Sequence, residues 1–465
     1  MLLPTLSSLS GALSAVVLLS LYSKSKQQNS YMKKTLLLIA TLLASYVGMA
    51  QETYHPTAEN LKAREQFQDE KFGIFLHWGL YSMMGTTEWI MTNRDINYKE
   101  YPKLAKTFYP SEFDADAWVK AIKAAGAKYI TITTRHHDGF SLFKTDTSTY
   151  NSVDGTPFKR DIIKEIADAC QRNGIKLHLY YSHLDWGRED YPVGRTGTGT
   201  GRPKEKANWP SYYTFMNTQL TELLTNYGKV GAIWFDGWWD HDSDAKPFDW
   251  QLEEQYAMIH KLQPQCLVAN NHHHTPFPGE DIQIFERDLP GENKAGLSGQ
   301  SIGRLPLESC QTINEHWGYN ITDTLYKSPK ELIQMLVRAA GKNANLLLNI
   351  GPEPGGALPE LALDRLQAIG EWLNQYGETI YGTRGGIVGP HEWGVSTQRG
   401  NKLYIHILNC MDSSLFIPTG NHKIKSATVF GTNKRVNFTK TGNGITLNLD
   451  TVPTDIDYIV ELTLG

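Results

Sequence analysis

The chain has 465 residues, of which 40% are hydrophobic and 20% are charged, and its formal net charge is −4. This composition is typical of a globular protein of two or three domains, and it argues against a nucleic-acid-binding protein or one that binds acidic membranes. The 12 Trp and 23 Tyr residues often lie near His and Asp, a combination that suits sugar binding, although large protein cores also contain many aromatics.

Residues 32–50 have the pattern of a secretory signal peptide, because two lysines precede an apolar run that ends in small residues. Cleavage after Ala50 would leave Gln51 first, with no cysteine there for a lipid anchor. A second apolar run, residues 13–22, is short for a membrane span, and we interpret residues 1–31 as an extension before a native start at Met32. The sequence thus predicts a leader at 1–50, a periplasmic or secreted protein, and no stable membrane insertion after the leader is removed.

From residue 71 onward, strand patterns alternate with amphipathic helix patterns. The predicted strands cover residues 71–79, 127–140, 175–186, 231–240, 266–274, 281–288 and 345–352, with a weaker strand near 307–313. The predicted helices cover residues 113–126, 160–174, 211–227, 252–262, 328–341 and 359–376. Such alternation implies parallel pairing, and the strand count favours a (β/α)₈-type, TIM-like barrel over an open doubly wound sheet. No G-x-G-x-x-G motif follows a strand, which argues against a dinucleotide fold.

After about residue 381 the hydrophobic period changes to two. Short strands are expected at residues 402–409, 423–431, 434–439, 444–449 and 458–464. They predict a C-terminal antiparallel β-sandwich at 381–465, behind a barrel domain at 51–380. We expect the sandwich to be an accessory domain because it lacks clusters of reactive side chains.

Four cysteines occur along the chain, and none forms a C-x-x-C pair: Cys170, Cys266, Cys310 and Cys410. Cys170 lies on the apolar face of a predicted helix, and Cys266 opens a predicted strand. Buried free thiols are therefore favoured over disulfides or a zinc site.

Active sites of such barrels lie at the carboxyl ends of the strands, and here nearly every strand ends in polar or aromatic side chains. Asp236 follows a buried apolar strand and is flanked by Trp234, Trp238 and Trp239. A carboxylate there can attack an anomeric carbon, whereas the structural alternative is an aspartate that caps the next helix. A nucleophile of this kind needs a second carboxyl group about 5 Å away if configuration is to be retained.

Histidines at the strand ends can donate hydrogen bonds to sugar hydroxyl groups. Adjacent residues of a strand face opposite sides, so His136 and His137 both reach a pocket only if the strand has ended there. The alternative is one pocket histidine and one packed histidine. The run from His272 to His274 has poor spacing for a metal, so no metal site is predicted.

Five segments resemble glycoside hydrolase family 29, the α-L-fucosidases, and the likeness extends from about residue 59 to the end of the chain. They are KFGIFLHWG, the Glu88–Trp89 pair, TTRHHDGF, LYYSHLDW and IWFDGWW. The sequence looks most like Bacteroides members of that family. The resemblance implies hydrolysis of terminal α-L-fucosyl residues from oligosaccharides or glycoconjugates with retention of configuration, without a cofactor.

The resemblance also implies roles for single residues. In the family, the aspartate of the W-F-D-G motif is the nucleophile, so the resemblance implies this role for Asp236. The expected substrate-binding residues are His77, Glu88, Trp89, His136, His137, Tyr181, Trp234, Arg287 and Trp317. The acid/base lies in a variable region of the family, so the motif transfers it less directly. Glu292, in a Gly-flanked loop, is our expected acid/base, with Glu308 and Glu286 as alternatives.

Two other functions are compatible with the same barrel, namely a metal-dependent hydrolase and an inactive fucose-binding protein. Loss of activity in EDTA would favour the first, and binding of fucose without hydrolysis would favour the second. The loop at residues 191–206, rich in Gly, Thr and Arg, is expected to influence which glycosidic linkage is preferred. The sequence predicts neither the linkage nor the oligomeric state.

Overall fold

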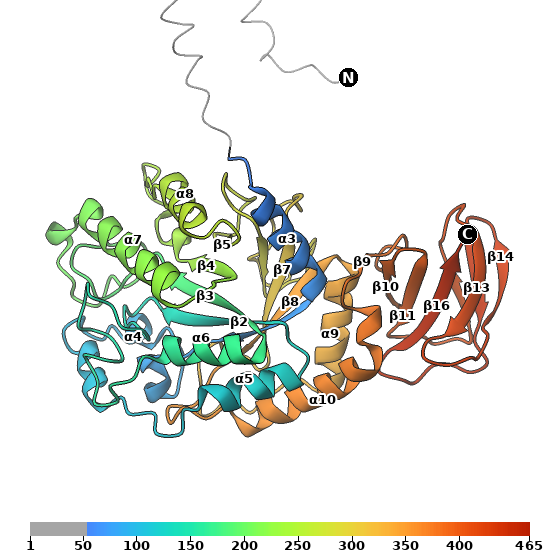
Figure 1. Cartoon of the computed structure of the whole chain (residues 1–465), viewed down its shortest axis with the longest axis horizontal. Coiled ribbons are helices and arrows are strands. Elements are labelled where there is room, and N and C mark those ends of the chain that lie inside the picture. The colour runs from blue at the N-terminus through green and yellow to red at the C-terminus, as the bar shows by residue number, and fades with distance from the viewer. Residues whose placement is uncertain (1–53) are drawn as a thin grey trace, which may run out of the picture. The chain divides into compact units, whose positions relative to one another are not determined.

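The computed structural model describes residues 54–465, so the predicted leader lies outside the described residues. An N-terminal helix, α3 (Ala58–Glu70), precedes an eight-stranded parallel sheet in the order β5-β4-β3-β2-β1-β8-β7-β6. A parallel bridge between Ala269 and Ile282 joins its two edges, so the sheet is a nearly closed barrel (Figure 1). The predicted TIM-like fold is confirmed.

The barrel strands are short and buried. They are β1 (Phe72–Leu76), β2 (Tyr129–Arg135), β3 (Lys176–Ser182), β4 (Ala232–Asp236), β5 (Leu267–Asn271), β6 (Gln283–Glu286), β7 (Leu307–Thr312) and β8 (Ala344–Ile350). Side chains of every strand are largely inaccessible, because the inner faces fill the barrel and the outer faces meet helices. The strand near residue 307, weak in the sequence pattern, is β7 and pairs with both β6 and β8.

Helices surround the barrel where the sequence predicts them. They are α5 (Ala115–Ala124), α6 (Ile162–Asn173), α7 (Trp209–Asn226), α8 (Leu252–Leu262), α9 (Pro329–Gly341) and α10 (Glu360–Tyr376). A short α4 (Ile90–Asn93) and 3₁₀ turns occupy the loops. The side chains of Asp114 and Asp161 cap α5 and α6 by accepting hydrogen bonds from backbone N–H groups. No helix separates β5 from β6 or β6 from β7, so residues 287–306 form a long irregular loop.

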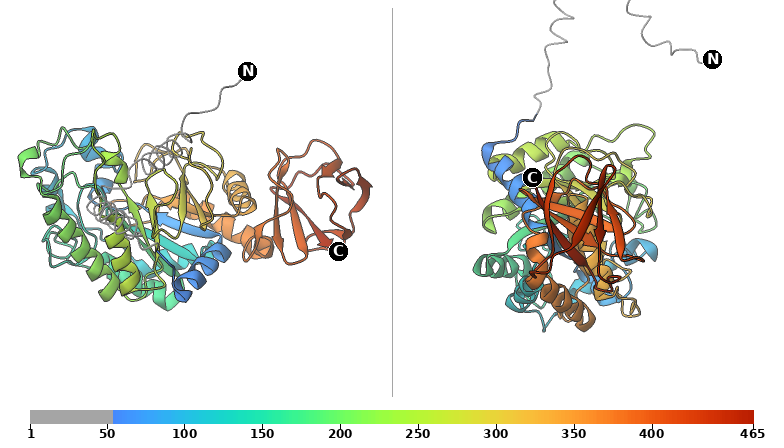
Figure 2. Two further views of the ribbon diagram at one scale, coloured as in Figure 1. Left: turned by 90° about the horizontal axis from the view of Figure 1, so that it is seen from above. Right: turned by 90° about the vertical axis from the view of Figure 1, so that its right-hand side faces the viewer.

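The C-terminal strands form two antiparallel sheets with a hydrophobic core of their own (Figure 2). One sheet contains β9 (Arg384–Gly385), β10 (Gly394–Arg399), β11 (Lys402–Ile407), β13 (Ile424–Val429) and β16 (Tyr458–Leu464). The other contains β12 (Ser414–Ile417), β14 (Asn437–Thr441) and β15 (Gly444–Asn448). The predicted β-sandwich is therefore present, with β9, β10 and β12 added to the predicted strands.

The α9 helix joins the barrel to the sandwich. The Gln334 side-chain amide donates hydrogen bonds to the carbonyls of Leu408 and Ile456, at 3.0 and 2.8 Å. At the end of α9, a Cβ on Gly341 would lie 2.4 Å from the Cβ of Val395 on β10, so only glycine allows this approach. Among the described residues, no helix is both long and apolar enough to cross a membrane.

The start of α9 provides a stability test. Ser328 and Glu331 form a capping box, in which each side chain bonds the backbone N–H of the other residue. We predict that Ser328→Ala lowers the free energy of unfolding by about 1 kcal/mol. Urea unfolding followed by tryptophan fluorescence measures this change. The control is Thr218→Ala on α7, whose exposed hydroxyl bonds the Thr214 carbonyl within the helix and should contribute nothing.

Candidate active site

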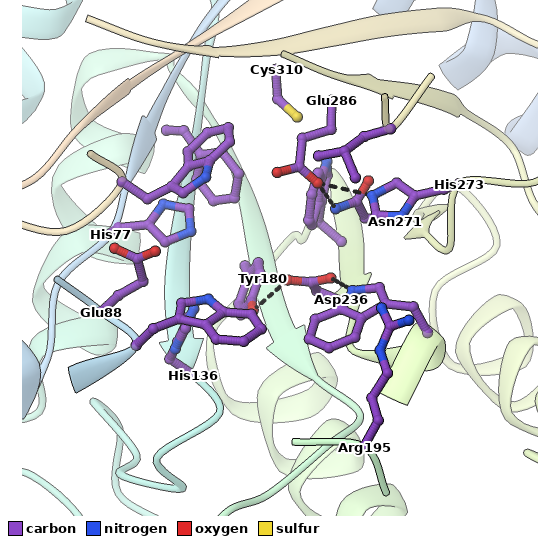
Figure 3. A pocket seen from close by; sticks show the side chains of 16 residues that line it. His77, Glu88, His136, Tyr180, Arg195, Asp236, Asn271, His273, Glu286 and Cys310 are labelled. Carbon is purple, nitrogen blue, oxygen red and sulfur yellow. Dashed lines mark hydrogen bonds and ion pairs between the residues drawn. The ribbon is translucent and has the colours of Figure 1, made fainter. Parts of the chain in front are cut away.

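A pocket opens at the carboxyl ends of the barrel strands (Figure 3). Its empty volume, which includes space open to solvent, is about 660 Å³. The lining combines aromatic rings with histidines and carboxyl groups. The lining residues are Phe75, His77, Glu88, Trp89, His136, Tyr180, Arg195, Trp234, Asp236, Trp239, Asn271, His273, Glu286, Leu297, Cys310 and Trp317.

Asp236 is the last residue of β4, and the chain turns sharply behind it. Gly237 has a φ of 97°, and a Cβ there would lie 2.9 Å from the backbone nitrogen of Leu184. The turn brings Trp239 back over the carboxylate. Asp236 Oδ1 accepts hydrogen bonds from the Gly237 N–H at 2.8 Å and the Trp239 indole at 2.9 Å. Oδ2 accepts one from the Tyr180 hydroxyl at 3.0 Å.

These contacts hold a carboxyl group that burial makes costly to ionise. Burial, together with the charge of Glu286, raises the pKa of Asp236 to about 6, and the bonds from Trp239 and Tyr180 limit the rise. No side chain caps the short 3₁₀ helix Trp238–His241 that follows. Asp236 therefore faces the pocket instead of serving the next helix.

Glu286 ends β6 and faces Asp236 across the pocket in Figure 3. Its Oε2 accepts hydrogen bonds from Asn271 Nδ2 at 2.8 Å and from His273 Nε2 at 2.9 Å. Burial alone would raise the pKa of Glu286, but the bonds and charge of His273 and the bond from Asn271 outweigh it and lower the pKa. Two carboxyl groups with different hydrogen-bond partners thus share one pocket.

His77 and His136 are uncharged donors and acceptors in the pocket. Burial lowers the pKa of His77 to about 3 and that of His136 well below its usual value. The Asn349 amide nitrogen donates to the Trp317 carbonyl at 2.7 Å, which leaves its oxygen to accept from His77 Nδ1 at 2.6 Å. A neutral His77 that donates through Nδ1 presents the lone pair of Nε2, which accepts a hydroxyl proton.

Aromatic rings form the walls around these polar groups. Trp89 stacks on Trp239 with 5.5 Å between ring centroids, and Trp317 lies 5.3 Å from the His77 ring. The Trp234 indole donates to Glu308 Oε1 at 2.9 Å and is thereby fixed at the base of the pocket. Apolar faces beside hydrogen-bonding edges match the amphipathic surface of a sugar ring.

Residues 41–378 match the profile of the family described as Alpha-L-fucosidase. This chain belongs to the α-L-fucosidase family. It is also 30% identical to plasma α-L-fucosidase of Rattus norvegicus over 79% of this chain and 82% of that protein. The chain is therefore a glycoside hydrolase.

Solved structures of α-L-fucosidases have the same fold. Isoenzyme 1 from Paenibacillus thiaminolyticus is 35% identical, with a TM-score of 0.78, over 88% of this chain and all of that one. A family 29 α-L-fucosidase from Bacteroides thetaiotaomicron is 27% identical, with a TM-score of 0.76, over 90% of this chain and 98% of that one. That structure holds a trapped covalent intermediate formed from 2-fluoro-fucosyl fluoride. The family relationship and this intermediate identify a retaining fucosidase.

The structure of this fucosidase brings together most of the predicted site residues. Those that line the pocket are His77, Glu88, Trp89, His136, Trp234, Asp236, Glu286 and Trp317. The Glu88 carboxylate accepts the Gly318 N–H at 2.9 Å, which fixes it beside Trp317. These positions come from five different strands or their following loops.

Three predicted binding residues lie outside the pocket lining. Tyr181 faces the outer side of β3, where its hydroxyl donates to Gln219 at 2.7 Å, and Tyr180 takes the inner position because side chains alternate along a strand. His137 lies behind Asp236, with Nδ1 2.7 Å from Ser182 Oγ and Nε2 3.5 Å from Asp236 Oδ2. Arg287 has its guanidinium 5.0 Å from the centre of the Trp317 ring and donates to the Glu315 carbonyl.

Glu292, the expected acid/base, is also outside the pocket lining. Its carboxylate oxygens lie 2.9 Å from Lys342 Nζ and 3.0 Å from Lys294 Nζ, in a separate depression that Arg338 and His391 also line. The irregular loop after β6 carries Glu292 away from the strand end. Glu308 is fully buried under Trp234 and accepts a hydrogen bond from Tyr129, so it supports the pocket from within the barrel.

Several pocket residues were not predicted individually. Tyr180, Trp239, Asn271 and His273 stand within the quoted motifs or strand ends, and the register of each strand is the signal that would have selected them. Arg195 comes from the loop expected to influence linkage preference. All four cysteines are free, and Cys310, one of three buried thiols, reaches the pocket lining.

Proposed function

We propose that this chain hydrolyses terminal α-L-fucosides by double displacement, with Asp236 as the nucleophile and Glu286 as the acid/base. The observation that carries the proposal is the pair itself. Asp236 ends β4 and Glu286 ends β6, and their carboxyl groups line one pocket and face each other across it (Figure 3). A retaining glycosidase requires such a facing pair.

In the first step, Asp236 attacks C1 of the fucosyl ring while Glu286 donates its proton to the departing glycosidic oxygen. Asp236 must be ionised, and its three hydrogen-bond donors stabilise the carboxylate. Glu286 must be protonated. A bound sugar excludes water from the pocket, and this further desolvation, together with the Asp236 charge, raises the pKa of Glu286 in the complex.

In the second step, water attacks the glycosyl ester and Glu286 accepts its proton. The covalent bond to C1 neutralises Asp236, so the like charge that opposed ionisation of Glu286 disappears. The pKa of Glu286 therefore falls when the residue changes from acid to base. Release of α-L-fucose restores the Asp236 carboxylate.

We assign His77, His136 and Glu88 to the hydroxyl groups of fucose, since these three polar side chains line the pocket beside the carboxyl pair. Trp89, Trp234 and Trp317 supply the apolar faces. The substrate class is a fucosylated oligosaccharide or glycoconjugate. We assign the preference for a glycosidic linkage to residues at the rim of the pocket, where Arg195 and Leu297 extend from two long loops.

The predicted signal peptide makes the periplasm or the exterior the proposed location, where such glycans are encountered. We keep as part of the proposal that the chain is most like Bacteroides members of the family. The metal-dependent and inactive alternatives gain no support from the family relationship. Activity that survives dialysis against EDTA and release of free fucose separate the proposal from both of them.

Replacement of the carboxyl pair tests the two roles. On an aryl fucoside with a good leaving group, Asp236→Gly should lose nearly all turnover, and azide should restore it with β-fucosyl azide as product, since only one inversion remains. Glu286→Ala should lose roughly 10²–10⁴-fold in kcat on poor leaving groups. Azide should then form α-fucosyl azide by two inversions. NMR of the product measures its anomeric configuration.

Glu292→Ala is the matched control, because this half-buried glutamate is bonded to lysines outside the pocket. It should turn over poor leaving groups at a rate close to that of the native enzyme. A large loss in Glu292→Ala, with Glu286→Ala nearly unaffected, would return the acid/base role to Glu292 and refute our assignment.

Trp239 gives a second test, through pH. Its indole bond lowers the pKa of Asp236, so Trp239→Phe should raise that pKa and move the acid limb of the kcat profile, which reports the enzyme–substrate complex, to higher pH. On the acid side of this limb, kcat should fall about tenfold, as expected for the loss of a charge-assisted hydrogen bond. Trp238→Phe is the control, because that ring packs on His274 and Phe277 and should leave the limb in place.

A further inference from the structure

The run of three histidines after β5 has no role in the proposed reaction, and its members occupy three different environments. His272 is buried and pairs with Glu280 at 3.0 Å. His274 is exposed and packs its ring against Trp238, with 5.1 Å between centroids. Only His273 lines the pocket. Within residues 54–465, no group of three or more His, Cys, Asp or Glu side chains is arranged to hold a metal ion.

The backbone turns at His273 so that its ring reaches Glu286. His273 has a φ of 66°, a left-handed conformation that few non-glycine residues adopt. The His274 N–H donates to the His272 ring at 3.0 Å, which fixes the turn on both sides of this position. His273 Nε2 then lies 2.9 Å from Glu286 Oε2. The local backbone conformation therefore holds the His273 imidazole in the pocket.

Both donors that bind Glu286 use the same oxygen. Asn271 and His273 both bond Oε2, and no described residue bonds Oε1. Figure 3 shows the two dashed bonds leaving one side of the carboxyl group, above Asp236. Oε1 is thus left for the substrate.

We propose that His273 is a positioning residue for the reaction, which anchors Glu286 by Oε2 and keeps Oε1 directed at the leaving-group oxygen. This inference rests on the proposed role of Glu286 as the acid/base. Anchoring one oxygen restricts the carboxyl group to one rotamer, so less freedom is lost when the transition state forms.

The charge of His273 adds an electrostatic effect to this anchor. The groups that face it are Glu286 on β6, Asp236 on β4 and Arg195 from the loop after β3, besides its neighbours His272 and His274. Burial disfavours the imidazolium, but the bond and charge of Glu286 and the charge of Asp236 outweigh burial and raise the pKa of His273. In return, the imidazolium lowers the pKa of both carboxyl groups.

Two substitutions at His273 separate the bond from the charge. His273→Gln keeps an N–H donor near the position of Nε2 and removes the charge. The pKa values of Asp236 and Glu286 should both rise, so both limbs of the kcat/KM profile should move to higher pH, with the optimum value within about threefold of native. His273→Ala also loses the anchor. Its kcat/KM for a fucoside with a poor leaving group should fall roughly 10- to 100-fold, with a smaller loss for a good leaving group.

His274→Gln is the matched control and should leave both limbs and the leaving-group dependence unchanged. Thermal unfolding of each variant shows whether it is folded. An unshifted profile in His273→Gln, with equal losses for good and poor leaving groups in His273→Ala, would overturn the inference. Azide rescue of Glu286→Ala tests the acid/base role independently. If azide rescues Glu286→Ala but the His273 variants behave like the native enzyme, only the inference about His273 is refuted. If azide does not rescue Glu286→Ala, the proposed acid/base role of Glu286 is refuted as well.

Discussion

Two carboxyl groups buried in one pocket repel each other, and the architecture of this fucosidase is organised around that repulsion. Each charge in an apolar cavity is costly, and a second like charge nearby increases the cost. The protein offsets this cost by giving the two carboxyl groups different hydrogen-bond donors. Asp236 receives an indole, a phenol and a backbone N–H, whereas Glu286 receives an amide and an imidazole. The unequal donors help to separate the pKa values of the two carboxyl groups, as the proposed two-step reaction requires.

The parallel barrel supplies these donors because it brings distant segments together at one edge. Ser182, Asp236 and Asn271 end the adjacent strands β3, β4 and β5, and the register pairs Asp236 with Ser182 on one side and Asn271 on the other. Tyr180 lies two residues before the end of β3. A shift of one residue in β3 would turn Tyr180 to the outer face, and in one of the two directions it would place Leu179 beside Asp236 in its stead. The register of the central strands therefore determines the chemistry of the pocket.

The sequence predicted the features that depend on periodicity. Strands and helices of the barrel have clear hydrophobic patterns, so the fold and the strand-end position of Asp236 could be inferred. The orientation of adjacent residues depends on where each strand ends, and for that reason Tyr180 was not distinguished from Tyr181, nor the pocket residue His136 from His137. The loop at residues 287–306 has no periodic pattern, so nothing in the sequence indicated that Glu292 bonds lysines away from the pocket.

The close approach of Gly341 to Val395 has a consequence for protein engineering. The last turn of α9 and strand β10 are fitted to one another without space for a methyl group, and Gln334 uses sandwich carbonyls as its acceptors. Truncation near residue 381 would uncover an apolar helix face and leave the half-buried Gln334 amide without these acceptors. Minimal versions of this enzyme for biotechnology should therefore retain the C-terminal sheets, and fusion partners are better attached beyond β16.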